Sequence, residues 1–131
     1  MAVFYHIDAA ERTIFCEFEG AVTDKELLEA VARLWAEPEY RPEYSRLIDT
    51  TGSNSARLSA EAVRWIALRN ARACIGKTAL VASTDATFGI CRMYELYSEG
   101  IPCQVFRNRS DALAWLAGNE PALIATAAGA L

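Results

Sequence analysis

Polar residues that could do chemistry follow three of the predicted strands. They lie in the segments 49–53, 83–85 and 107–110. In a parallel sheet, ligands bind beyond the carboxyl ends of the strands, where helix N-termini present free amides. We therefore expect these groups to share one edge of a sheet and to bind a small anion or a partner protein. The set consists of Asp49, Thr50, Thr51, Ser53, Thr84, Asp85, Arg107, Arg109 and Ser110.

A structural explanation competes for the same residues. Ser59, Thr84 and Ser110 precede predicted helices, where hydroxyls cap free amides. Asp49 and Asp85 are typical strand-end residues that bind loop amides, and the two arginines could simply be solvated. The sequence favours this structural explanation.

Catalytic chemistry is not predicted. A nucleophilic serine or cysteine needs a base and an orienting group. His6, the one histidine, falls on the predicted first strand, away from the serine-bearing segments. Asp49 and Asp85 have no third group that would mark them as acid and base. We expect a non-enzymatic domain with no catalytic residue.

Cofactor and metal sites are not predicted either. The segment 76–78 reads Gly-Lys-Thr, as at the end of a phosphate-binding loop, but the required first glycine is Ala71. This segment also leads from a helix into a strand, the reverse of the required order. No C-x-x-C motif is present, and one histidine cannot complete a His/Cys metal set. Buried free thiols are expected at Cys16, Cys74, Cys91 and Cys103.

Hydrophobic periodicity predicts the elements that position these residues. Alternating apolar residues indicate a β-hairpin over 3–18, and the sequence 23–26 has the form of a capping box that begins a helix over about 24–37. Residues 50–55 are expected to form a loop. The remaining strands are predicted at 46–49, 78–82 and 101–106, and the remaining helices at 59–72, 83–99 and 110–118.

The predicted order is β-β-α-β-α-β-α-β-α, which defines the fold class as α/β. Strands that alternate with crossover helices imply a mixed, mainly parallel sheet, with the first strand antiparallel in its hairpin. The length of 131 residues suits one domain over 1–120. Residues 121–131 would form an apolar tail or a short helix.

Charge and hydropathy exclude several classes of partner. The net charge of −4 gives no positive field for nucleic acid. No apolar run reaches the roughly 18 residues that span a bilayer, and the N-terminus lacks the pattern of a signal peptide. We expect a cytoplasmic protein without a membrane span.

Two predicted helices carry apolar residues beyond those that one buried face requires. On the second, Trp65 and Leu68 lie beside the apolar stripe and near three arginines. The third is apolar around most of its girth and includes Phe88 and Tyr97. Such surplus apolar surface would suit a homodimer or another protein contact, and for the third helix burial on two sides within the fold is the alternative.

Four segments of the chain resemble one known group of proteins. They are Leu47-Ile48-Asp49-Thr50-Thr51-Gly52, Phe88-Gly89-Ile90-Cys91-Arg92-Met93-Tyr94-Glu95, Val105-Phe106-Arg107 and Ala112-Leu113-Ala114-Trp115-Leu116. These segments resemble the SpoIIAA-like group of small bacterial proteins, which is related in fold to STAS domains.

The resemblance implies a regulatory role without catalysis, as in antagonists of anti-sigma factors. There, phosphorylation of a serine at a helix N-terminus breaks the contact with a partner kinase. Ser59 is the nearest match, although Leu58-Ser59-Ala60-Glu61 lacks the glycine that follows in the group.

Two functional hypotheses remain open. The first is a regulatory or protein-interaction domain, with a regulatory protein as its partner. The alternative is a carrier of a small ligand or lipid, bound in an apolar pocket between sheet and helices that the third helix gates.

Overall fold

The computed structural model describes residues 3–53, 57–73 and 75–118. The predicted order of elements is confirmed, and the predicted tail 121–131 lies outside the described residues. The elements are β1 (Val3–Asp8), β2 (Thr13–Gly20), α1 (Asp24–Ala36), β3 (Ser45–Ser53), α2 (Ala60–Arg72), β4 (Thr78–Val81), α3 (Asp85–Tyr97), β5 (Cys103–Phe106) and α4 (Arg109–Leu116).

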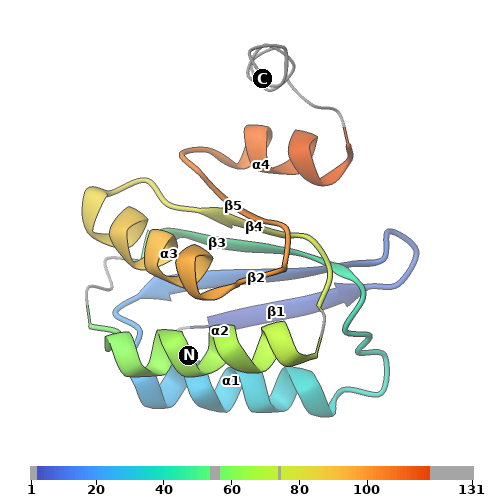
Figure 1. Cartoon of the computed structure of the whole chain (residues 1–131), viewed down its shortest axis with the longest axis horizontal. Coiled ribbons are helices and arrows are strands. Elements are labelled where there is room, and N and C mark those ends of the chain that lie inside the picture. Colours follow the sequence, from blue (N-terminus) through green and yellow to red (C-terminus); the bar gives the residue numbers. More distant parts are fainter. Residues whose placement is uncertain (1–2, 54–56, 74, 119–131) are drawn as a thin grey trace.

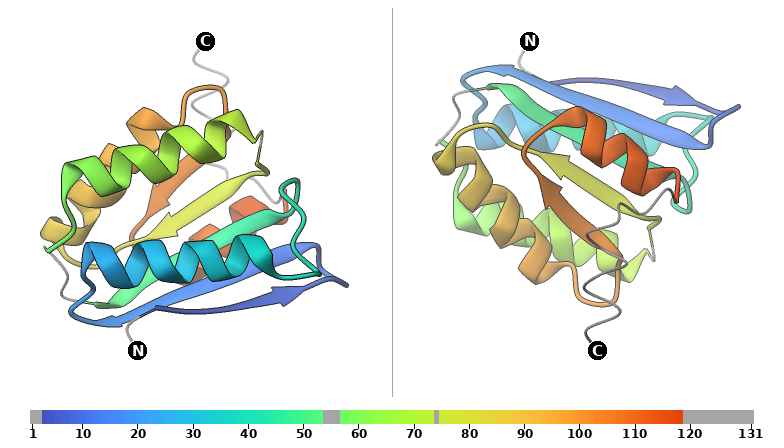
Figure 2. Two further views of the ribbon diagram at one scale, coloured as in Figure 1. Left: turned by 90° about the horizontal axis from the view of Figure 1, so that it is seen from below. Right: turned by 90° about the horizontal axis from the view of Figure 1, so that it is seen from above.

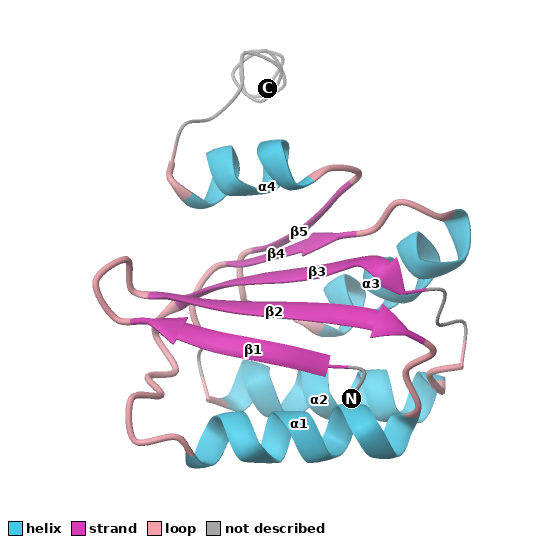
Figure 3. Cartoon of the chain, turned by 180° about the vertical axis from the view of Figure 1, so that it is seen from behind, coloured by secondary structure: helices cyan, strands magenta, loops and turns pink. Residues whose placement is uncertain are grey.

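The five strands form one sheet in the order β1-β2-β3-β4-β5. β1 pairs with β2 in an antiparallel hairpin, and the other neighbours are parallel, as predicted (Figure 3). Right-handed crossovers between successive strands place every crossover helix on the same face of the sheet. Accordingly, α1, α2 and α3 cover one face and α4 covers part of the other (Figure 1).

Two hydrophobic cores lie on the two faces. The larger joins the sheet to α1, α2 and α3 and includes Phe18, Leu27, Ile66 and Tyr94. The smaller lies under α4, which packs on β3, β4 and β5 (Figure 2). In β4, for example, Leu80 therefore serves the larger core, and Ala79 and Val81 serve the smaller one.

Local capping interactions begin the helices. Thr23 and Glu26 form the predicted capping box of α1, and Thr84 caps α3. The N-cap of α4 is Asn108, whose side chain accepts a hydrogen bond from the Asp111 amide. The prediction that Ser110 caps this helix was wrong, because the helix already begins at Arg109 and the Asn108 side-chain oxygen accepts from the Asp111 N–H in its first turn.

The predicted loop at 50–55 was also wrong over 50–53, because β3 continues through Ser53, and the rest of that prediction lies outside the described residues. β2 extends to Gly20 and pairs with the end of β3 beyond an irregularity, where β3 carries one residue more than β2. Gly52 fits this close approach, since a Cβ there would lie 2.8 Å from the Phe18 carbonyl oxygen. Pairing with a distant strand outweighed the local preference for a turn.

The Gly-Lys-Thr segment joins two parts of the fold. A Cβ on Gly76 would lie 2.4 Å from the Glu43 carbonyl oxygen, so only glycine fits. Lys77 Nζ donates to the Trp115 carbonyl oxygen at 2.7 Å and lies over the Trp115 ring. Close backbone packing accounts for this motif.

None of the helices in the described ranges is both long and apolar enough to cross a membrane.

Candidate ligand-binding site

The predicted strand-end residues form two compact ionic clusters. In the first, Arg109 Nη1 lies 3.0 Å from Asp49 Oδ2 and 3.6 Å from Glu17 Oε1. The amide and hydroxyl of Thr51 donate to Asp49 Oδ1 at 2.9 and 2.6 Å. Burial alone would raise the pKa of Asp49, but the bonds from Thr51 and Arg109 outweigh burial and lower it. Sequence inspection missed Glu17, which joins the cluster from β2.

The second cluster surrounds the start of α3. Arg107 Nη2 lies 3.2 Å from Asp85 Oδ1, and Nη1 is 3.4 Å from the Ser83 carbonyl oxygen. The guanidinium also lies 4.0 Å from the ring centre of Phe88. These groups bind one another, which leaves less of their bonding capacity for a ligand.

The other residues predicted for this edge differ in exposure. Thr50 and Ser53 are buried, and their hydroxyls donate to the carbonyl oxygens of Val81 and Gly20. Ser110 is exposed in the first turn of α4. Ser59 is exposed and caps α2 by accepting from the Ala62 amide, while its own amide donates to Asp24 Oδ1.

The predicted contact residues divide into two pairs. Trp65 and Leu68 are 53% and 39% exposed, so α2 presents them to solvent. Phe88 and Tyr97 are half-buried and pack against the larger core. Only the first pair offers substantial apolar surface.

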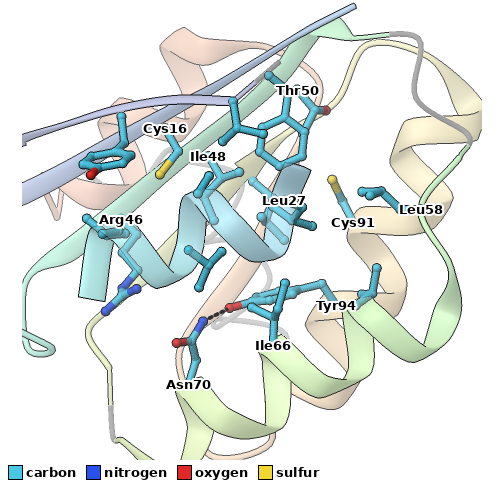
Figure 4. Close-up of a pocket in the computed structure, with 18 of the residues that line it drawn as sticks. Cys16, Leu27, Arg46, Ile48, Thr50, Leu58, Ile66, Asn70, Cys91 and Tyr94 are labelled. Carbon is cyan, nitrogen blue, oxygen red and sulfur yellow. Dashed lines mark hydrogen bonds between the residues drawn. The ribbon is translucent and has the colours of Figure 1, made fainter. Parts of the chain in front are cut away.

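An apolar cavity of about 100 Å³ lies between the sheet and helices α1, α2 and α3 (Figure 4). Leu27 and Ala30 line it from α1, Ile66 from α2, and Cys91 from α3. For comparison, an engineered protein cavity of about 150 Å³ binds benzene. This cavity is smaller than the one that binds benzene, so its size suits a short apolar chain.

Arg46 is the one ionic side chain among the described residues that line this cavity. It is the second residue of β3, is only 4% exposed, and lies toward the end of the cavity where Asn70 is found (Figure 4). Its Nη2 atom donates to the Tyr40 hydroxyl at 2.5 Å and to the Pro42 carbonyl oxygen at 3.5 Å. The cavity is thus apolar with a cationic end.

The other titratable groups of the cavity are neutral at physiological pH. Burial raises the pKa of the Cys16 and Cys91 thiols to about 11. Burial also raises the pKa of Tyr94 to about 12, and its hydroxyl accepts a hydrogen bond of 2.8 Å from Asn70. The positive charge of Arg46 therefore has no opposing charge inside the cavity.

A hollow of about 440 Å³ adjoins the cavity and shares Trp35 and Asn70 with it. Arg69 and Arg72, both in the last turn of α2, line this outer hollow. The Arg69 guanidinium lies 3.9 Å from the centre of the Trp35 ring. Tyr40 and Pro42, which bind Arg46, line it too.

The cationic end of the cavity lies toward the edge of the sheet opposite the predicted one. Arg46 lies near the amino end of β3, whereas the strand-end clusters lie at the carboxyl ends of the strands. Sequence inspection missed Arg46, Tyr40 and Asn70. The available signal was an arginine directly before the apolar pair Leu47 and Ile48 of a predicted strand.

This arrangement suits binding better than catalysis. An apolar cavity holds a small molecule by burying its surface, and a single fixed charge orients it. Within residues 3–53, 57–73 and 75–118, no three His, Cys, Asp or Glu side chains gather as a metal site would require.

Comparison with known proteins supports the fold but gives no function. No protein-family model matches the chain, and no curated protein matches it significantly. A solved structure from Shewanella loihica PV-4, an uncharacterised protein of the DUF3478 family, matches over 88% of this chain and 94% of its own. Its TM-score is 0.60 at 19% sequence identity. Because that protein has a SpoIIAA-like fold, the predicted resemblance is confirmed at the level of architecture: this chain has a SpoIIAA-like α/β fold.

Proposed function

We propose that the protein binds a small, largely apolar molecule in the cavity between the sheet and α1, α2 and α3. The observation that carries this proposal is the cavity itself, which about twenty mostly apolar side chains surround. Protein interiors are normally close-packed, and a void costs the contacts that its lining would otherwise make. A bound molecule would restore those contacts.

The size of the cavity narrows the class of ligand. About 100 Å³, less than the volume of the benzene-binding cavity, accommodates a short chain. Pockets for drug-sized ligands are several times larger. The carrier hypothesis therefore applies to a small molecule, because a long lipid tail is too large for the cavity.

Native mass spectrometry of gently purified protein tests this function. We expect a reproducible added mass of small-molecule size, which disappears after unfolding and refolding in the absence of other molecules. Refolded protein should regain an adduct when incubated with a small-molecule extract of its source cells. A bare mass in both experiments would contradict the proposal.

A second candidate function is protein interaction, including a homodimer, and exposed aromatic surface on α2 favours it. The ring centres of Trp65 and Trp35 lie 6.0 Å apart. Leu68, on the same helix as Trp65, is exposed too. Aromatic residues flanked by arginines are enriched at protein interfaces. Light scattering over a range of concentrations tests the homodimer.

Ser59 remains a proposed phosphorylation switch within that second function. Its exposed hydroxyl at the N-terminus of α2 suits a phosphate, which helix amides stabilise. Asp24 and Glu61 lie beside it and would oppose the added charge. Equal binding of S59D, S59A and wild type to every partner would contradict this switch.

A further inference from the structure

The guanidinium of Arg46 is buried with part of its bonding capacity unused. Both of its side-chain hydrogen bonds are made by Nη2, to Tyr40 and Pro42. The Nε atom is fully buried and finds no acceptor among the described residues. Buried polar groups in native proteins are nearly always hydrogen-bonded, so each exception needs an explanation.

Arg46 also has no carboxylate partner in the described part of the chain. The ion pairs there are formed by Arg92, Arg107 and Arg109, all at other places in the fold. The Tyr40 ring, 5.3 Å from the guanidinium carbon, supplies a cation–π contact without a negative charge. A buried, uncompensated positive charge is unfavourable unless an anion accompanies it.

The surroundings of Arg46 favour the approach of an anion. Arg69 and Arg72 are exposed in the adjoining hollow. Glu37, the C-cap residue of α1, is negatively charged, but its carboxylate accepts a hydrogen bond of 2.7 Å from the Tyr5 hydroxyl. A cationic entrance therefore leads to a cationic end of an apolar cavity.

We propose that the ligand is a small carboxylic acid, with its carboxylate at Arg46 Nε and an apolar body of about six carbons in the cavity. This inference rests on the proposed binding function and adds the chemistry of the ligand. A carboxylate supplies both things that Arg46 lacks, an acceptor for Nε and a negative charge. An apolar body without the acid group supplies neither.

Isothermal titration with hexanoate and hexanamide tests this inference, because the two probes have nearly the same shape and differ in charge. Wild-type protein should bind hexanoate at least about tenfold more tightly, as expected for a charge-assisted hydrogen bond to a buried group. Arg46→Met should remove the preference and leave hexanamide binding within about threefold of wild type. Arg92→Met, an exposed arginine on α3, is the matched control and should keep the preference.

Each outcome separates the two proposals. Equal binding of both probes by wild type would overturn the carboxylate inference and leave cavity binding intact. If wild type binds neither probe, and binds no other acid or amide of four to eight carbons, both proposals are contradicted. A preference that persists in Arg46→Met would place the acid elsewhere and overturn the inference. A thermal melt of each variant confirms that it is folded.

Discussion

Arg46 Nη2 donates to the Tyr40 hydroxyl at 2.5 Å, across the boundary between the inner cavity and the outer hollow. Tyr40 belongs to the connector between α1 and β3, so this bond ties the connector to the sheet. It also fixes the guanidinium at the polar end of the cavity while its Nε remains without an acceptor.

Replacement of Arg46 by methionine should leave the protein as stable as wild type, or more stable. The change removes a buried charge that has no counter-ion and keeps an apolar side chain of similar length. We expect the free energy of unfolding in urea to stay the same or to rise by up to about 2 kcal/mol. A loss of more than about 2 kcal/mol would show that Arg46 serves the fold and not a ligand.

Filling the cavity should abolish binding without unfolding the protein. Ala30 on α1 is buried and lines the cavity, so Ala30→Leu would occupy part of the space. Its free energy of unfolding should stay within about 1 kcal/mol of wild type, because the new side chain enters an existing void. Ala32→Leu, exposed on the same helix, is the control and should bind normally. Binding by Ala30→Leu at wild-type affinity would place the ligand outside the cavity.

Much of the fold could be predicted from sequence because its signals are local. The capping box of Thr23 and Glu26 and the alternation in β1 and β2 each depend on a few neighbouring residues. Trp65 was placed on the exposed side of α2 because it falls outside the apolar stripe. The late end of β3 was missed because it depends on pairing with β2 at Gly20, about 30 residues away in the chain.

The cavity could not be predicted either, because it too depends on residues that lie far apart in the chain. Its lining comes from seven elements and the segments between them, and no periodicity records how closely the helices approach the sheet. Arg46 precedes the apolar pair Leu47 and Ile48, but the lack of an acceptor for its Nε atom is a property of the surrounding fold. The rule that ligands bind beyond the carboxyl ends of parallel strands predicted a site at that edge, where Asp49 and Arg109 instead bind each other.

The Asp49 cluster should make stability depend on acid pH. Because the pKa of folded Asp49 is lowered from its ordinary 3.8, its contribution is complete above the unfolded pKa and is lost as the pH falls through the folded pKa. Asp49→Asn should reduce the free energy of unfolding by about 1 to 2 kcal/mol at pH 7. Urea unfolding from pH 6 to pH 2 should show a smaller loss of stability in Asp49→Asn than in wild type. Parallel pH curves would contradict this role.

The cavity thiols should react slowly in the native protein. A pKa of about 11 for Cys16 and Cys91, against an ordinary 9.0, reduces the thiolate fraction at pH 7.5 about 100-fold. Iodoacetamide labelling, mapped by mass spectrometry, should be slower by at least this factor than in urea. Hexanoate should further protect Cys16 and Cys91, which line the cavity, more than Cys103, which does not. Equal protection of all three would indicate general stabilisation and not occupancy of the cavity.

The α2 surface gives a prediction for the second function. Trp65→Ala should weaken any self-association or partner binding by at least about tenfold, as expected for a central aromatic contact. The fold should be retained, because Trp65 is 53% exposed. Leu96→Ala, an exposed apolar residue on α3, is the control. If both variants assemble like wild type in light scattering, the α2 surface is not an interface.

The most direct test of the central claim is the NMR signal of the Arg46 Nε–H group in ¹⁵N-labelled protein, assigned by its loss in Arg46→Met. If a carboxylate binds at Arg46, titration with hexanoate should move this signal strongly downfield and saturate with the same affinity as calorimetry, while hexanamide should move it much less. An Arg46 Nε–H signal that hexanoate leaves in place while other cavity residues shift would show that Arg46 does not recognise the acid. A spectrum that hexanoate leaves unchanged at every residue would contradict binding in the cavity itself.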